Sequence, residues 1–136
     1  MKADLTAEGA EMGDGLSGRI IGAAIEVHRH LGPGLLESAY EACFAHELTE
    51  RGMRVARQVT LPVLYKGVSV ECGYRIDLVV DDLVLCELKA VERLMDVHLA
   101  QVLTYLKLSG IRLGLLINFN QRVLRHGIKR IALSST

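Results

Sequence analysis

Three charged side chains stand out from two short apolar segments: Asp77 in the first segment, and Glu87 and Lys89 in the second. A buried carboxylate without a partner costs several kcal/mol, or raises its pKa until it is neutral. Carboxylate oxygens are also ligands that Mg²⁺ and Mn²⁺ prefer, and such an ion polarises a phosphoryl oxygen and activates a bound water. The three residues therefore predict metal-assisted hydrolysis, in which Lys89 orients the water or offsets charge in the transition state.

Whether the two carboxylates meet depends on the turn between the segments. Both segments have the composition of β-strands, so residues two apart share a face of the sheet. A two-residue turn would put Asp77 and Glu87 on opposite faces. A shared site therefore requires an odd-length loop such as 81–83, or a bulge near Asp77. The alternative is that these residues form surface ion pairs, Glu87 with Lys89 or Asp77 with Arg75.

Polar residues on two expected helices add to this set. Glu37 falls in the first turn of the helix before the strands, where the helix dipole also favours an acidic side chain. His98, Gln101 and Tyr105 are spaced so that they share one face of the helix that follows the strands. These residues could line the same site, although each alone also fits the surface of a helix.

The helices and strands that must position these residues are predicted from the spacing of hydrophobic residues and from the glycines and prolines that end each element. Their order, ααβββαβ, predicts an α/β fold with one mixed sheet flanked by helices. The first three strands form an antiparallel meander, the fourth is buried on both faces, and a terminal segment adds an edge strand. The expected helices are 16–31, 35–51 and 91–109, and the expected strands are 55–64, 68–80, 83–90, 111–119 and 128–133.

The chain of 136 residues is expected to form a single domain, 15–136, preceded by a flexible N-terminal arm, 1–14. Apolar residues make up 50% and charged residues 24%, which is ordinary globular composition. The N-terminal segment is polar, and no apolar run reaches the roughly 20 residues that span a bilayer. We therefore expect a cytoplasmic protein that does not associate with a membrane.

The cysteines and the charges narrow the function further. Cys43, Cys72 and Cys86 are too few and too widely spaced for a zinc site or a disulfide framework, and we expect Cys43 and Cys86 to be buried free thiols.

The formal net charge is zero, but every acidic residue lies at or before Asp96. The basic C-terminal part could face nucleic acid, or its charges could simply be scattered over the surface.

Five segments of the chain occur in the order of a known family. They are Gly34-Leu-Leu-Glu-Ser-Ala-Tyr40, Tyr74-Arg-Ile-Asp77, Glu87-Leu-Lys-Ala90, His98-Leu-Ala-Gln101 with Tyr105-Leu-Lys107, and Gly114-Leu-Leu-Ile-Asn-Phe119. From about Leu16 to Ile131 the chain resembles the small bacterial GxxExxY proteins, which are grouped with the PD-(D/E)XK nuclease superfamily. Ile76 stands where the superfamily's name has proline, at a position that commonly varies.

The resemblance implies a restriction-endonuclease-like core and a Mg²⁺ or Mn²⁺ cofactor. It assigns metal binding to Asp77, Glu87 and Glu37, with Glu37 as the acid on the helix before the sheet. It also makes Lys89 the catalytic lysine and Gln101 the polar residue of the following helix. The full set of implied catalytic residues is Glu37, Asp77, Glu87, Lys89 and Gln101. The resemblance assigns no role to three further motif positions, which are candidates for lining the site: Tyr40, His98 and Tyr105.

Two functions remain open at this point. The first is a Mg²⁺-dependent nuclease that hydrolyses phosphodiester bonds of DNA. The second is a non-catalytic module with the same fold that binds nucleic acid or another protein. The intact Asp77, Glu87 and Lys89 favour the first, whereas the neutral net charge and small size favour the second, or a homodimer with a larger binding face.

Overall fold

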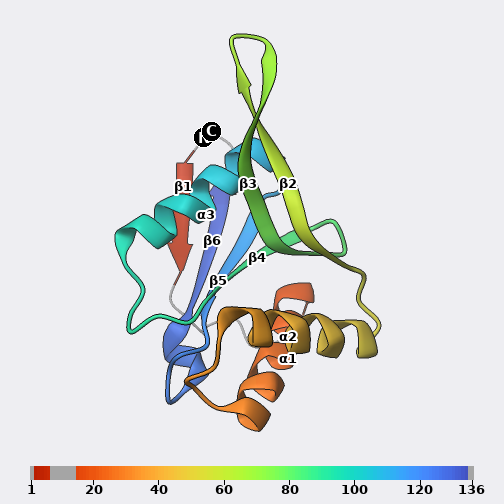
Figure 1. Ribbon diagram of the computed structural model, residues 1–136, viewed down its shortest axis with the longest axis vertical. Coiled ribbons are helices and arrows are strands. Elements are labelled where there is room, and N and C mark those ends of the chain that lie inside the picture. Colours follow the sequence, from red (N-terminus) through yellow and green to blue (C-terminus); the bar gives the residue numbers. More distant parts are fainter. Residues whose placement is uncertain (1, 7–14, 135–136) are drawn as a thin grey trace.

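The computed structural model (Figure 1) describes residues 2–6 and 15–134. Within this part of the chain, six strands form one mixed sheet in the order β1-β6-β5-β4-β3-β2. The pair β4–β5 is parallel, and all other neighbouring strands are antiparallel. The elements are β1 (Lys2–Thr6), α1 (Leu16–Leu31), α2 (Glu37–Glu50), β2 (Val55–Tyr65), β3 (Val68–Val80), β4 (Val84–Lys89), α3 (Asp96–Ser109), β5 (Leu113–Asn118), the short 3₁₀ helix η1 (Leu124–Gly127) and β6 (Ile128–Ser134).

Helices cover both faces of the sheet. On one face, α1 and α2 pack against a hydrophobic core that includes Phe44, Leu78 and Cys86. On the other face, α3 packs against a second core that includes Leu85 and Leu106. The central strands β4 and β5 are buried on both sides, as their continuous apolar composition predicts for parallel neighbours.

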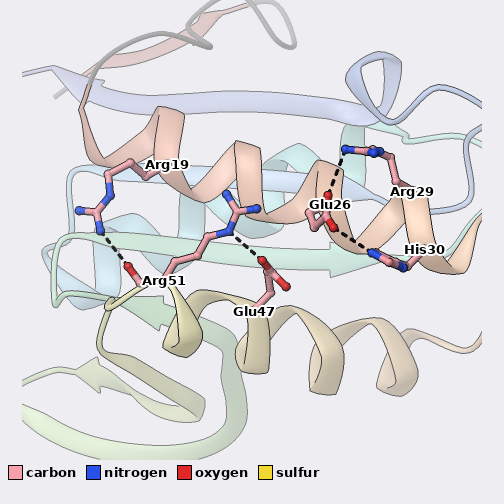
Figure 2. Close-up of polar contacts among 6 residues, drawn as sticks. All are labelled: Arg19, Glu26, Arg29, His30, Glu47 and Arg51. Atoms are coloured by element: carbon pink, nitrogen blue, oxygen red, sulfur yellow. Dashed lines mark hydrogen bonds and ion pairs between the residues drawn. The ribbon is translucent and has the colours of Figure 1, made fainter.

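Local ion pairs stabilise the outer surfaces of α1 and α2 (Figure 2). The guanidinium of Arg51 lies 2.8 Å from Oε2 of Glu47, one helical turn earlier, and Nη2 of Arg19 donates to the carbonyl of Arg51. On α1, Glu26 pairs with Arg29 and His30. These side chains interact with one another or with the backbone at the surface of the helices. The candidate functional residues lie elsewhere in the molecule.

The β3–β4 turn has the odd length that a shared carboxylate site requires. Leu78 pairs with Cys86 and Val80 with Val84, which leaves the three residues 81–83 in the loop. Both aspartates of this loop adopt left-handed backbone conformations, with φ 52° and 58°. The register requirement stated from the sequence is therefore confirmed.

Several expected elements differ from the structure. Lys2–Thr6, expected within a flexible arm, form an edge strand beside β6, while the rest of that arm lies outside the described residues. The third helix begins at Asp96 rather than at 91, because the buried Asn118 side chain bonds both backbone groups of Val91 and holds the preceding segment as a loop. Cys86 is buried as expected, but Cys43 is exposed.

The β2–β3 hairpin is the most exposed part of the sheet. Figure 1 shows its tip (green) projecting beyond the rest of the molecule. Leu64, Tyr65 and Val68 near this tip are each more than half exposed.

None of the described helices is both long and apolar enough to cross a membrane.

Candidate metal centre

Asp77 lies where β3 separates from β4. Their described ladder pairing ends at Leu78, and the backbone N–H of Leu88 instead donates a 2.8 Å hydrogen bond to Oδ2 of Asp77. The strand is also turned at this point. Ile76 packs in the core beneath α3 and Leu78 in the core beneath α1 and α2, although residues two apart in a regular strand share a face. The turn directs the carboxylate of Asp77 toward β4.

Glu87 is the neighbouring carboxylate on β4. Its side chain is only 5% exposed, and its Oε1 is buried without a hydrogen-bond partner among the described residues. Burial, followed by the negative charge of Asp77, raises the pKa of Glu87 to about 8. Burial and the charge of Glu41 likewise raise the pKa of Asp77, against the lowering effect of the Leu88 hydrogen bond. The charge of Asp77 disfavours ionisation of Glu87, and a cation bound beside the two carboxylates would offset this effect.

Lys89 follows Glu87 on the same face of β4. Its Nζ lies 3.7 Å from Oε2 of Glu87, and its side chain is 16% exposed. The pair anticipated as a surface ion pair is therefore largely buried. A buried pair holds its charges in a fixed position, but it contributes little net stability after desolvation. No ion pair joins Asp77 to Arg75 in the described chain.

Gln58 and Glu41 belong to the same group of side chains, and sequence reasoning missed both. Nε2 of Gln58 lies 2.7 Å from Oε1 of Glu41 and 3.3 Å from Oδ1 of Asp77, so one amide joins two carboxylates. Glu41 is largely buried on α2 and pairs with Arg57 at 3.2 Å. Gln58 was missed because its φ of 52° is not predicted by a strand pattern. Glu41 was missed because in the sequence it resembles the surface glutamates of the same helix.

The polar residues expected to line the site from α3 form hydrogen bonds close to one another in the chain. Nε2 of Gln101 donates a 2.9 Å hydrogen bond to the hydroxyl of Tyr105. Burial raises the pKa of Tyr105, and the negative charge of Glu87 raises it further. Nδ1 of His98 accepts the backbone N–H of Met95 at 2.9 Å, so His98 caps the start of α3.

Neither Glu37 nor Tyr40 forms a hydrogen bond or ion pair with Asp77 or Glu87 in the described part of the chain. Glu37 is exposed in the first turn of α2, and the interactions described for α2 connect Glu41, one turn later, with Asp77. Tyr40 is fully buried and stacks on Phe119 with ring centroids 4.6 Å apart. Its hydroxyl donates to the carbonyl of Gly32 and accepts the N–H of Leu35. Tyr40 therefore secures the loop between α1 and α2 and forms part of the core there.

The donor set fits a hard divalent cation. No cluster of three or more histidine, cysteine or acidic residues with metal-binding geometry occurs in residues 2–6 and 15–134. Mg²⁺ does not require one, because it retains several waters and is commonly held by one or two carboxylates together with substrate phosphate. The unpartnered Oε1 of Glu87 and the adjacent Asp77 carboxylate offer that pair of oxygen ligands.

Comparison with known proteins identifies a family for the chain. The family model of the PD-(D/E)XK nuclease superfamily matches residues 14–131, which is most of the chain. Searches of the curated proteins and of the solved structures gave no match. The match confirms the expected fold class, a restriction-endonuclease-like mixed sheet with flanking helices. The chain belongs to the PD-(D/E)XK nuclease superfamily.

Proposed function

We propose that this protein is a Mg²⁺-dependent nuclease that hydrolyses phosphodiester bonds of DNA, with Mn²⁺ able to replace Mg²⁺. The observation that carries the proposal is the convergence of Asp77 and Glu87 beside Lys89, with a buried Glu87 oxygen that lacks a partner among the described residues. Membership of the superfamily supports a phosphodiester substrate. DNA is chosen over RNA by analogy with the superfamily.

Each side chain has a distinct role in this proposal. Asp77 and Glu87 hold the ion, and the hydrogen bond from Leu88 keeps Asp77 in place for this purpose. When bound, the ion would polarise a phosphoryl oxygen and lower the pKa of a coordinated water. The ammonium of Lys89 orients the attacking water and offsets negative charge as the bond to phosphorus forms.

The acid contributed by the preceding helix is best assigned to Glu41. The resemblance implied Glu37, but Glu41 is the α2 residue whose charge acts on Asp77 and which Gln58 connects to it. Gln101 retains its implied role as the polar residue of α3, and it donates a hydrogen bond to the hydroxyl of Tyr105.

The test is cleavage of single-stranded, double-stranded and branched DNA and of RNA, with Mg²⁺, Mn²⁺ or EDTA. Wild type is expected to cleave DNA only when the metal is present. Lys89→Ala should lose at least about a hundredfold in rate, which is the order expected for a group that stabilises the transition state. Lys107→Ala is the matched control, because Lys107 is an exposed lysine of α3.

Cleavage that persists in EDTA, or that Lys89→Ala leaves unchanged, would contradict the proposed mechanism. Metal-independent binding of nucleic acid with no cleavage of any substrate would favour the alternative of a non-catalytic binding module. The oligomeric state during turnover, measured by light scattering, shows whether a homodimer provides a larger binding face.

A further inference from the structure

A pocket lies between α3 and the projecting hairpin, and its lining includes Gln101 and Tyr105, two of the residues expected in the site. Its volume is about 290 Å³, close to the lower end of the range for small-molecule sites. A pocket of this size accommodates one small planar group. It is lined by Tyr74 from β3 and by Val97, His98, Ala100, Gln101, Thr104 and Tyr105 from α3.

One wall of this pocket is aromatic. The ring of Tyr74 stands edge-on to the ring of Tyr105, with centroids 6.1 Å apart and an interplanar angle of 68°. Tyr105 is buried, whereas Tyr74 is 41% exposed. Two of the four tyrosines in the chain therefore meet here, and one of them presents accessible ring surface.

The lining also offers hydrogen-bonding groups without a fixed charge. The hydroxyl of Tyr105 accepts from Gln101, so its own proton can be donated to a ligand. Nδ1 of His98 is occupied as an acceptor for Met95, which places the proton of the neutral ring on Nε2 as a donor. The hydroxyl of Thr104 donates to Ala100 and can accept a further hydrogen bond.

The absence of lysine and arginine from the lining argues against a phosphate ligand in the pocket itself. An uncharged, planar group with hydrogen-bonding edges fits these surroundings. Nucleobases have this chemistry, and stacking of a base on an aromatic side chain contributes to binding whatever the base.

We propose that this pocket binds one unpaired nucleobase next to the scissile phosphate, so that the protein prefers single-stranded or frayed DNA to fully paired duplex. In duplex, both faces of a base are covered by its neighbours and its pairing edge is engaged, so the base would have to leave the stack to enter. This inference rests on the proposed nuclease function and specifies the substrate class of the same site.

The test measures binding in the Lys89→Ala background with Mg²⁺, where the proposed mechanism slows turnover by at least about a hundredfold. Fluorescence anisotropy gives the Kd for a labelled single-stranded oligonucleotide and for the blunt duplex of the same sequence. Tyr74→Ala is expected to weaken single-strand binding by about 5- to 150-fold, and to change duplex binding by less than about twofold. Tyr65→Ala is the matched control, because Tyr65 is an exposed tyrosine of the same hairpin outside the pocket.

The outcomes separate the two proposals. The pocket is supported if single-stranded DNA binds more tightly than duplex, and if Tyr74→Ala abolishes this preference while Tyr74→Phe retains it. Equal affinity for both substrates, or equal effects of Tyr74→Ala and Tyr65→Ala, overturns the pocket while metal-dependent cleavage by wild type still stands. If no nucleic acid is bound and none is cleaved, the proposed function fails as well. Thermal unfolding of each variant verifies that the exposed substitutions leave the fold intact.

Discussion

The backbone N–H of Leu88 donates a 2.8 Å hydrogen bond to the carboxylate of Asp77. This bond takes the place of a ladder bond at the point where β3 and β4 separate. It fixes Asp77 next to Glu87, the residue that precedes Leu88 in the chain. The Asp77 carboxylate is therefore held at a local break in sheet pairing, and its negative charge contributes to the raised pKa of Glu87.

The first prediction concerns stability and pH in the absence of metal. The pKa of Glu87 is about 8 in the folded protein, against an ordinary value of 4.5. Between these values the folded state binds more protons than the unfolded state, so the free energy of unfolding falls as pH rises. For one proton the slope is at most about 1.4 kcal/mol per pH unit. Urea unfolding at a series of pH values measures it.

Glu87→Gln should reduce this slope and make the metal-free protein more stable than wild type above pH 8. The reason is that the neutral amide removes a buried charge and its repulsion of Asp77. Asp77 retains a smaller effect of the same sign. Equal slopes in the two proteins, or a wild type that gains stability between pH 5 and 8, would be incompatible with this account.

The second prediction concerns Tyr40. Tyr40→Phe removes the hydroxyl that bonds Gly32 at 2.6 Å and Leu35 at 3.1 Å, but keeps the stacking on Phe119. We expect a loss of about 1 kcal/mol in the free energy of unfolding, because the partly buried Gly32 carbonyl and Leu35 N–H lose this partner. Metal affinity should stay unchanged. Chemical denaturation measures this loss, and Tyr65→Phe, at an exposed position, is the control. A weaker Mn²⁺ affinity in Tyr40→Phe than in wild type would show that Tyr40 belongs to the metal site after all.

The third prediction decides which acid of α2 belongs to the site. The charge of Glu41 acts on Asp77, whereas Glu37 is exposed at the start of the helix. Glu41→Gln should therefore weaken Mn²⁺ binding by a few-fold to about tenfold, corresponding to roughly 1 kcal/mol. Glu37→Gln should have less effect. Calorimetric titration of the two variants compares them directly, and a larger loss in Glu37→Gln would assign the role to Glu37 as the resemblance implied.

Much of the fold could be predicted because its hydrophobic periodicity is clear. The helix at 16–31, the β2–β3–β4 meander and the doubly buried β5 all agree with the structure. The start of α3 could not be predicted, because it depends on a distant side chain, Asn118, that holds the preceding loop. The pairing of Lys2–Thr6 with β6 is likewise a contact between the two ends of the described chain.

The part of the candidate site that could be predicted consists of residues whose type alone is unusual for their position. Asp77, Glu87 and Lys89 are charges in apolar strands, and such positions can be recognised from the sequence. Gln58 could not be recognised, because its part depends on a left-handed backbone conformation within a strand. Glu41 could not be separated from other glutamates of α2 until the packing of that helix was known.

The most direct test of the central claim is a calorimetric titration of Mn²⁺ into the metal-free protein at pH 8.5. Wild type should bind the ion, and Asp77→Asn and Glu87→Gln should each weaken binding by about tenfold or more, since each removes one carboxylate ligand. Glu50→Gln, at an exposed position at the end of α2, should bind like wild type. Wild-type affinity in both Asp77→Asn and Glu87→Gln, or no binding to wild type, would contradict a metal held by Asp77 and Glu87.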